Sequence, residues 1–310
     1  MITYIDLRTG AEMFGCRSSV LCLGTFDGVH RGHAELVKET LVLRDILRQN
    51  DPQILGGAWC FRQPPASFLS KKACKQITDM SEKAEIFKSL GLDFVAIGDF
   101  EELRDLSAEK FISDVLVSGC GCKGVVCGFN FTFGKGGSGD PDFLAKKFKG
   151  AVKVLPPVTF DGSVVSSSTV RNFILNGELE SALELMGRPY SISATVIEGK
   201  KLGRKLGFPT INQAVPDNKL LPRSGVYATK TSIDGKEYFS VTNVGCNPTV
   251  KDSFVRCETH VIGYDGVLYG KDVKISFYKY LRAEQKFESI EELVLAVKQN
   301  ITQTQKYFEI

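Results

Sequence analysis

The first half of the chain alternates short apolar runs with stretches of helical periodicity. In order along the chain, these strand-like and helix-like segments cover residues 19–24, 33–47, 53–61, 81–90, 94–97, 108–116, 124–127 and 142–148. Such alternation predicts an α/β fold in which a parallel sheet is covered by helices on both faces. In sheets of this kind, ligands bind where the carboxyl ends of the strands meet the amino ends of the helices.

The periodicity changes near Gly187, and beyond it short β-branched and aromatic runs are separated by turn residues. Asp234-Gly235 lies between two such runs and has the composition of a two-residue hairpin turn. Near the end, Ser289 and Glu292 form an S-x-x-E pattern that begins a helix. We therefore expect two domains, 1–186 and 187–310, the second being a small antiparallel β-barrel with a C-terminal helix.

The composition is that of a globular protein, because 43% of the 310 residues are hydrophobic and 24% are charged. The net charge of +3 is too small for a protein that coats nucleic acid, although small anionic substrates need only a few local basic groups. Residues 1–10 contain Asp6 and Arg8 and lack the apolar core of a signal peptide. We expect a cytoplasmic protein with neither nucleic-acid nor membrane partners, and we leave its oligomeric state open.

Nine cysteines are scattered along the chain. Their number is odd, and without an export signal they are interpreted as reduced thiols. Cys120, Cys122 and Cys127 lack C-x-x-C spacing and lie among apolar residues and glycines. We interpret this group as buried packing rather than as a metal site.

The segment between the first predicted strand and the first predicted helix is rich in glycine and histidine. It reads Gly24-Thr25-Phe26-Asp27-Gly28-Val29-His30-Arg31-Gly32-His33. Unpaired N–H groups at a helix start suit a triphosphate, and Gly24 and Gly28 let the backbone approach it closely. His30 and His33 share one face and can donate to phosphate oxygens as negative charge builds. A glycine-rich turn with incidental histidines is the alternative, but two of the chain's three histidines lie here.

A second glycine-rich segment follows the first predicted barrel strand. It reads Gly199-Lys200-Lys201-Leu202-Gly203-Arg204-Lys205-Leu206-Gly207-Phe208-Pro209-Thr210-Ile211-Asn212. Its glycines and cations suit a loop that holds phosphate. Thr210 and Asn212 would face the same side of an extended chain, and their oxygens suit Mg²⁺. On these residues alone, a solvated basic hairpin explains the segment equally well.

The histidine-containing segment resembles the G-x-F-D-G-x-H-x-G-H signature of FAD synthetases, which belong to a wider nucleotidyltransferase superfamily. Residues 128–134 resemble the family's G-x-[DN]-F-x-F-G segment, and residues 165–171 resemble its I-S-S-T-x-I-R segment. The resemblance implies a Rossmann-like domain that adenylylates FMN. The residues it implies for ATP binding are Gly24, Phe26, Asp27, Gly28, His30, His33, Asn130, Ser166, Ser167, Ser168 and Arg171. The serines also suit a helix N-cap, and the two roles are compatible.

One segment departs from the family pattern. The family has an F-[DE]-P-H-P-like turn after the second strand, whereas this chain reads Phe61-Arg62-Gln63-Pro64-Pro65. Pro64 stands where the family has histidine, so the contribution of that imidazole comes from elsewhere, with Arg62 as the candidate, or is lost. The phosphate of FMN is already an anionic nucleophile, so positioning and charge stabilisation with Mg²⁺ carry this reaction without a general base.

The second glycine-rich segment resembles the riboflavin kinase motif G-x-x-x-G-R-x-x-G-F-P-T-x-N, and every fixed position matches. Residues 242–249, 258–260 and 281–287 resemble the family's N-[VI]-G-x-N-P-T, E-T-H and L-R-x-E-x-x-F segments. Mg²⁺ would be held by Thr210 and Asn212. The implied ATP-binding residues are Gly199, Gly203, Arg204, Gly207, Pro209, Thr210 and Asn212, and the implied flavin-binding residues are Asn243, Glu258 and Arg282.

Riboflavin offers a neutral alcohol, so its phosphorylation requires a base. A carboxylate in a partly desolvated pocket can accept that proton, and the family's catalytic glutamate falls on Glu258. The alternative is a strand glutamate that pairs with Arg256 or Arg282 on a solvated face. His260 lies two residues further on, and we expect it to be structural.

The motifs together predict a bifunctional enzyme that uses ATP to phosphorylate riboflavin to FMN and to adenylylate FMN to FAD. Three alternatives stay open. The chain could be a riboflavin kinase with an impaired adenylyltransferase domain, or a cytidylyltransferase-like enzyme, which leaves the barrel unexplained. It could also be a non-catalytic flavin-binding or regulatory protein, although the intact basic loop and Glu258 argue against that.

Overall fold

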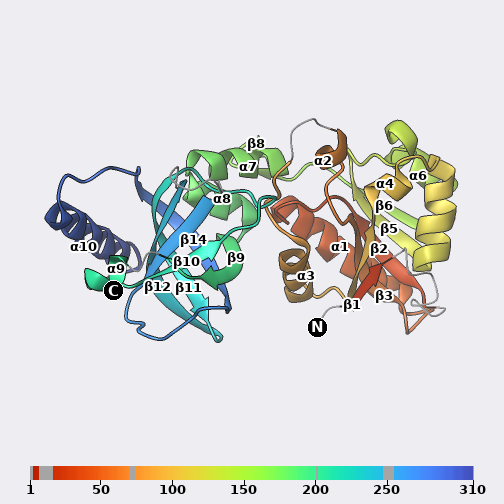
Figure 1. Ribbon diagram of the computed structural model, residues 1–310. Coiled ribbons are helices and arrows are strands. Elements are labelled where there is room, and N and C mark those ends of the chain that lie inside the picture. Colours follow the sequence, from red (N-terminus) through yellow and green to blue (C-terminus); the bar gives the residue numbers. More distant parts are fainter. Residues whose placement is uncertain (1–2, 7–16, 70–73, 200–201, 247–254, 310) are drawn as a thin grey trace. The chain divides into compact units, whose positions relative to one another are not determined.

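The computed structural model describes residues 3–6, 17–69, 74–199, 202–246 and 255–309 (Figure 1). The chain forms two compact units, Met1–Ser167 and Ser168–Ile310. The predicted domain boundary, after residue 186, lies later in the chain than this division, because the segment just before residue 187 packs with the barrel. Helix α8 (Leu179–Met186) buries its apolar face and contacts strands β9 and β14 of the second unit.

The first unit is built on a six-stranded sheet whose paired strands are all parallel, in the order β1-β4-β3-β2-β5-β6. Its strands are β1 (Thr3–Asp6), β2 (Ser19–Leu23), β3 (Leu55–Phe61), β4 (Phe94–Gly98), β5 (Cys122–Gly128) and β6 (Ala151–Leu155). The α-helices are α1 (Arg31–Leu47), α2 (Ala66–Leu69), α3 (Met80–Ser89), α4 (Phe100–Leu103), α5 (Ala108–Lys110) and α6 (Pro141–Lys147). A π-helix covers Phe111–Gly119, and a 3₁₀ turn covers Lys135–Gly137. Strands β7 (Thr159–Phe160) and β8 (Ser163–Val164) form a separate two-stranded sheet.

The central strands are buried on both faces, as the sequence predicts. Leu21 and Leu23 of β2 belong to a core formed with the π-helix and α6, whereas Cys22 belongs to a core formed with α1 and α3. Successive side chains of a strand point to opposite faces, so each strand contributes to both cores. The predicted cysteine packing is confirmed, because Cys120, Cys122 and Cys127 are all buried.

Two features of this unit differ from the prediction. The helix predicted over 108–116 begins as α5 but continues as the π-helix. The sequence also did not predict β1 and β6, which lie at the two edges of the sheet. An edge strand is only partly covered, and the residues of β6 are half-buried or exposed, so its apolar pattern is weak.

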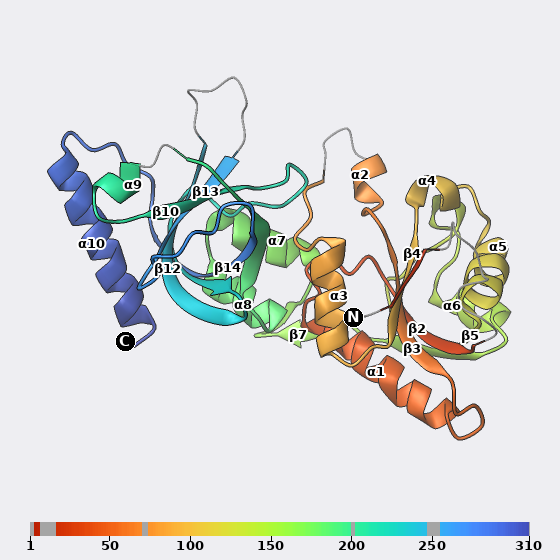
Figure 2. The ribbon, with the colours of Figure 1, turned by 60° about the horizontal axis from the view of Figure 1, so that its bottom comes forward.

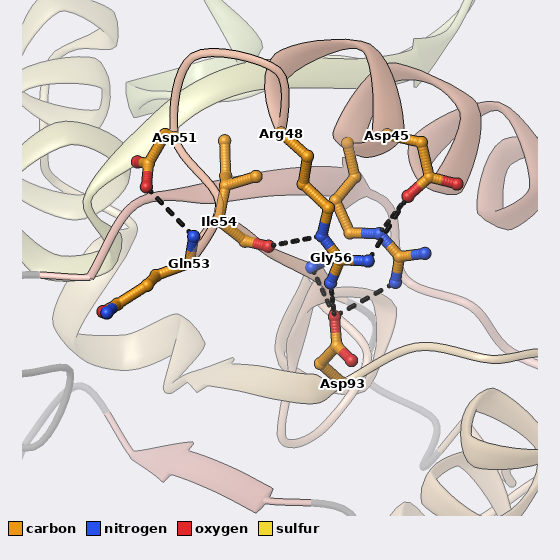
Figure 3. Close-up of polar contacts among 8 residues, drawn as sticks. Asp45, Arg48, Asp51, Gln53, Ile54, Gly56 and Asp93 are labelled. Carbon is orange, nitrogen blue, oxygen red and sulfur yellow. Dashed lines mark hydrogen bonds and ion pairs between the residues drawn. The ribbon is translucent and has the colours of Figure 1, made fainter.

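A polar cluster joins the end of α1 to the amino ends of β3 and β4 (Figure 3). The carboxylate of Asp93 accepts hydrogen bonds from the backbone N–H of Gly56 at 2.8 Å and from the Arg44 guanidinium at 3.2 Å. Arg48 donates to the carbonyl of Ile54. This cluster lies at the opposite ends of the strands from the predicted nucleotide site, so it supports the sheet rather than the chemistry.

The second unit contains a closed barrel of six antiparallel strands in the order β10-β13-β12-β11-β14-β9. The strands are β9 (Tyr190–Ile197), β10 (Thr210–Ala214), β11 (Gly225–Ile233), β12 (Lys236–Cys246), β13 (Val255–Val261) and β14 (Asp272–Arg282). The helices are α7 (Ser167–Asn176), α8, α9 (Leu202–Lys205) and α10 (Ile290–Tyr307). Figure 2 shows α10 along the outside of the barrel, and it contacts β11 and β12.

Local signals predicted two features of the barrel correctly. Asp234 and Gly235 form the turn between β11 and β12 with positive φ angles of 50° and 81°, which suits a tight hairpin turn. Ser289 caps α10 by accepting a hydrogen bond from the backbone N–H of Glu292 at 3.2 Å.

Buried hydroxyl groups link three strands inside the barrel. The Thr229 hydroxyl lies 2.8 Å from those of Ser240 and Thr242, and the Thr242 hydroxyl lies 2.9 Å from that of Thr259. These side chains are completely buried. The hydroxyl pairs hold β11, β12 and β13 in one register, and a slip of one residue would exchange the inner and outer faces of a strand.

Candidate active sites

The glycine- and histidine-rich segment forms the loop between β2 and α1. The backbone N–H of Gly24 donates to the carbonyl of Trp59 at 3.3 Å, and His30 is the N-cap of α1. The His30 and His33 rings stack with centroids 3.7 Å apart and planes inclined by 14°. His30 is buried. The predicted pair of imidazoles therefore lies together at the start of the helix.

The backbone of this loop is strained. Phe26 and Val29 have positive φ angles of 52° and 37°, and Gly28 has a φ of 80°. A non-glycine residue with positive φ is costly, most of all when it is β-branched. The Phe26 ring is buried against Phe87 and His33, with ring centroids 5.1 and 5.0 Å away. The surrounding packing thus holds the loop in a conformation that the chain would not adopt alone.

Contacts from Ile77, Thr78 and Ser167 hold the loop in place. The Asp27 carboxylate accepts hydrogen bonds from the backbone N–H groups of Ile77 and Thr78 at 2.8 and 3.3 Å. The Thr78 hydroxyl accepts from the N–H of Gly28 at 3.0 Å. Ser167 donates to the Asp27 carbonyl at 2.8 Å. Asp27 and Ser167 were predicted as ATP ligands, and these contacts show that both also support the loop; their contact with ATP stays a prediction.

The other predicted residues of this site occupy several elements. Asn130 is exposed in the turn after β5, which pairs with β2, so both strands end at the same edge of the sheet. Ser166 precedes α7 and is half-buried. Ser168 and Arg171 lie on α7 in the second unit, and their part in the site stays a prediction.

The turn that lacks the family's histidine contains an ion pair. Arg62 donates from Nε to the Asp99 carboxylate at 3.0 Å, which joins the carboxyl ends of β3 and β4. Beside it, the Phe100 ring centroid lies 5.5 Å from those of Phe61 and Phe68. Arg62 therefore supports the sheet edge, and its proposed replacement of the histidine stays a prediction. The sequence did not single out this aromatic group, because its members lie on three separate elements.

The barrel site is centred on a row of three side chains on neighbouring strands. In the strand register, Glu258 on β13 lies opposite Asn212 on β10 and Asn243 on β12. Directly opposed residues in antiparallel strands project from the same face. The adjacent row places His260 opposite Thr210. The predicted base, metal ligands and flavin ligand thus share the outer face of one sheet.

The glycine-rich loop passes very close to this row. A Cβ atom on Gly199 would lie 2.3 Å from the Asn212 amide nitrogen, and one on Gly203 would lie 2.4 Å from the Phe208 carbonyl oxygen. Gly207 has a φ of 85°. These three glycines are therefore required by close approach or by backbone conformation. Lys200 and Lys201 lie outside the described residues, as do residues 247–249 of the predicted N-[VI]-G-x-N-P-T segment.

Two members of this row, Glu258 and Asn243, line a cavity of about 250 Å³. The barrel strands supply polar groups to its lining, including Thr210, Asn243, Glu258 and Arg282, whereas α10 supplies mainly apolar side chains. The lining residues that the sequence did not predict as site residues are His260, Leu206, Phe208, Val226, Val241, Glu284, Gln285, Phe287, Leu293, Val294, Val297 and Asn300. The helical spacing of the last four could have indicated one face of α10 (Figure 2), but not what that face covers.

Two polar contacts join residues that line this cavity. Asn243 donates from its amide to the Glu284 carboxylate at 3.2 Å. Arg282 donates from Nε to the side-chain oxygen of Asn300 at 3.2 Å, and burial lowers the pKa of Arg282 from its ordinary value. His260 lies 2.9 Å from the Pro209 carbonyl oxygen through Nδ1, which supports the structural role expected of it.

A second cavity, of about 260 Å³, adjoins the first, and Thr210 lines both. Arg204, Pro209, Tyr264 and Tyr269 are among its other lining residues. Two of the predicted ATP ligands, Arg204 and Pro209, therefore lie in a cavity different from the one that contains Glu258. The tyrosines were not foreseen, because the connection between β13 and β14 carries no periodic pattern.

Both halves of the chain match families with flavin substrates. Residues 15–169 match the FAD synthetase family, and residues 186–308 match the riboflavin kinase family. A bifunctional riboflavin kinase/FMN adenylyltransferase of Listeria monocytogenes is 33% identical over 297 residues, which cover 94% of this chain and 93% of that protein. The chain belongs to the bifunctional riboflavin kinase/FMN adenylyltransferase family.

Other members of this family are similar over comparable lengths. The Bacillus subtilis enzyme is 31% identical, and the match covers 94% of this chain and 92% of that enzyme. The Escherichia coli enzyme is 33% identical, and the match covers 99% of this chain and 97% of that enzyme. A crystal structure described as a macrolide-efflux protein from Streptococcus pneumoniae has a TM-score of 0.88 at 27% identity, covering 98% of this chain and 99% of its own. Among the described residues, none of the helices combines the length and the hydrophobicity of a membrane-spanning segment.

Two oxygen-bearing side chains of the barrel bear on the predicted divalent cation, those of Thr210 and Asn212. Among the described residues, no cluster of three or more His, Cys, Asp or Glu side chains could hold a metal. Asn212, however, is only 6% exposed, and its buried side-chain oxygen has no hydrogen-bond partner within the described chain. An amide oxygen and the Thr210 hydroxyl are the hard ligands that Mg²⁺ accepts while it keeps several waters. The residues present therefore fit the predicted cation.

Proposed function

We propose that the chain catalyses its two reactions at separate sites. Riboflavin is phosphorylated to FMN in the barrel cavity, and FMN is adenylylated to FAD, with release of pyrophosphate, at the loop between β2 and α1. The row of Asn212, Glu258 and Asn243 beside a cavity carries the first assignment. The stacked His30 and His33 at a helix start support the second. Both reactions belong in the cytoplasm, where ATP is supplied and the buried cysteines stay reduced.

In the kinase reaction, the 5′-hydroxyl of riboflavin attacks the γ-phosphorus of ATP, and the bond to the β-phosphate oxygen breaks to release ADP. Glu258 accepts the hydroxyl proton. Within the described residues Glu258 forms no ion pair, which disfavours the alternative of a strand glutamate paired with Arg282. Its side chain is exposed but lines the cavity, whereas the prediction was a partly desolvated pocket. Riboflavin itself would exclude water from the carboxylate as it fills the cavity.

The two adjoining cavities accommodate the two substrates of the kinase. The isoalloxazine ring is planar and largely apolar, so it packs on the side lined by Phe287, Val294 and Val297. The polar ribityl chain then extends along Asn243 toward Glu258. The nucleotide lies in the second cavity, and its terminal phosphate reaches Thr210, which lines both. Thr210 and Asn212 would hold Mg²⁺, which neutralises phosphate charge when bound.

In the adenylyl transfer, a phosphate oxygen of FMN attacks the α-phosphorus of ATP, and pyrophosphate leaves with the electron pair of the broken P–O bond. No base is needed, because the nucleophile is already an anion. His30 and His33 donate hydrogen bonds to oxygens that gain negative charge during the transfer. Pro64 offers no such donor, so this chain performs the step without the imidazole that its family places there.

The products formed from each flavin test this assignment. Purified protein is incubated with ATP and Mg²⁺, and with either riboflavin or FMN, and the flavins are separated by chromatography. Glu258→Gln should abolish FMN formation and leave FAD formation from FMN intact. Replacement of both His30 and His33 by Ala should do the reverse. Loss of both activities in either folded variant would contradict two separate sites.

The same incubations distinguish the other candidate functions. Wild-type protein that makes FMN but no FAD would be a kinase with an impaired adenylyltransferase half, and Pro64 in place of the family's histidine would account for the loss. A preference for CTP over ATP would identify a cytidylyltransferase-like enzyme. Tight FMN binding without turnover of ATP would identify a non-catalytic flavin-binding protein. The match of residues 186–308 to riboflavin kinases argues against the last two.

A further inference from the structure

Helix α3 carries a lysine whose side chain is completely buried. Lys83 is 0% exposed, whereas lysines are almost never fully buried unless they are paired. Its ammonium group donates to the backbone carbonyl of Thr25 at 3.1 Å. Among the described residues it makes no other hydrogen bond and no ion pair. A cation that could donate three hydrogen bonds thus has one neutral acceptor.

Such an arrangement destabilises the folded protein unless something compensates. Removing an ammonium group from water is costly, and an apolar side chain of similar size would avoid that cost. The charge also acts on its surroundings: burial raises the pKa of the Cys60 thiol, and the nearby Lys83 charge partly offsets this rise. Within the described chain no carboxylate forms an ion pair with Lys83. The cost of burying this charge is therefore offset by an anion from outside the chain, or it is tolerated because the contact between Lys83 and Thr25 has a function.

The carbonyl that Lys83 holds belongs to the strained loop. Thr25 is the second residue of the segment between β2 and α1, and its peptide bond leads directly to Phe26, whose φ is 52°. Rotation of the Thr25–Phe26 peptide would relieve this φ angle, but it would also turn the carbonyl away from Lys83. Because the peptide is planar, holding its oxygen fixes the direction of its N–H group as well. Lys83 thus stabilises one orientation of the loop from the side of the core.

We propose that Lys83 is a positioning residue for adenylyl transfer. Its ammonium group holds the Thr25–Phe26 peptide in the orientation that receives the triphosphate of ATP, and its positive charge beneath the loop stabilises the negative charge of the phosphates. The inference rests on the proposed function, because it requires ATP to bind at this loop. It explains why a costly buried charge is placed where the chain is also strained.

Lys83→Met in the full-length protein tests the proposal. Methionine fills a similar volume but can neither carry the charge nor donate to the Thr25 carbonyl. FAD formation from FMN should show a kcat/KM for ATP that is lower by about 100-fold, the scale expected for a misplaced reacting group. The KM for FMN should change little. Riboflavin phosphorylation should be unchanged, and the Tm should be equal or higher because a buried charge is gone.

Two further variants make the result specific. Lys88→Met removes an exposed lysine from the same helix and should leave FAD formation and Tm unchanged. Lys83→Gln has no charge but can still donate to the carbonyl, so it should retain more activity than Lys83→Met; it also serves if the methionine variant does not fold. A folded Lys83→Met with wild-type kcat/KM for ATP would overturn the proposal. So would a parallel loss of Tm and of both activities, which indicates a structural role alone.

The outcome also separates this inference from the proposed function. If the wild-type protein makes no FAD, adenylylation at this loop is wrong and the role of Lys83 falls with it. If the wild-type protein makes FAD and Lys83→Met makes it equally well, the proposed function stands and the role of Lys83 alone is refuted.

Discussion

Gly199→Ala would show how closely the glycine-rich loop must approach Asn212. The added Cβ atom would lie 2.3 Å from the Asn212 amide nitrogen, whereas ordinary contacts begin near 3.4 Å. The side chain or the loop must therefore move by about 1 Å, and such a displacement of a group that positions a reactant costs about 100-fold in rate. Asn212 is only 6% exposed, so it has little room to rotate away.

The assay is the rate of FMN formation from riboflavin and ATP, with FAD formation from FMN as an internal reference. The kinase kcat should fall by about 100-fold, which corresponds to about 2.7 kcal/mol in the activation free energy, and adenylylation should be unchanged. Gly235→Ala is the matched control, because Gly235 has a φ of 81° in the same barrel but no atom within 4 Å of the added Cβ. It should lower stability by about 1 kcal/mol without reducing the kinase kcat.

Two results would refute this reasoning. Full kinase activity in Gly199→Ala, at wild-type Tm, would mean that Asn212 does not take part in the reaction or that the loop yields without consequence. An equal loss of kinase activity in Gly235→Ala would mean that general destabilisation of the barrel, rather than displacement of Asn212, causes the effect.

Two further predictions concern stability and reactivity. Asp93→Ala leaves the N–H of Gly56 and the Arg44 guanidinium without their shared acceptor. The free energy of unfolding in urea should therefore fall by about 1–2 kcal/mol, while both activities persist. An unchanged free energy of unfolding would show that the cluster in Figure 3 does not stabilise the protein. Burial raises the pKa of Cys22 and Cys257 to about 12, so their reactive thiolates are scarce at pH 8. Iodoacetamide should therefore modify these two cysteines only after the protein unfolds, as measured by peptide mass analysis. Rapid labelling of both cysteines in the native protein at pH 8 would contradict their burial.

Several features of this protein could be predicted from local sequence patterns. The alternation of strands and helices indicated a parallel sheet, and Asp234-Gly235 indicated a hairpin whose turn has the expected positive φ angles. The spacing of His30 and His33 placed both rings on one face of a helix start. These features depend on the 3.6- and two-residue periods and on turn stereochemistry, which act between residues close in sequence.

The resemblance to known families supplied the chemistry, and the comparisons confirm the family. It named Glu258, Asn212 and Asn243, although their positions in the chain do not say that they lie side by side. That adjacency follows from the register of β10, β13 and β12, and a buried hydroxyl contact supports the pairing of β12 with β13.

Tertiary structure alone decided what surrounds the two sites. No local pattern relates Lys83 to Thr25, Ile77 to Asp27, or Val297 of α10 to the cavity that contains Glu258. These contacts join elements that are distant in sequence, and they form because the sheet and the barrel bring strand ends, helix ends and loops to the same place. The sequence by itself therefore determined which groups are available for chemistry, whereas packing determined which of them meet and how rigidly they are held.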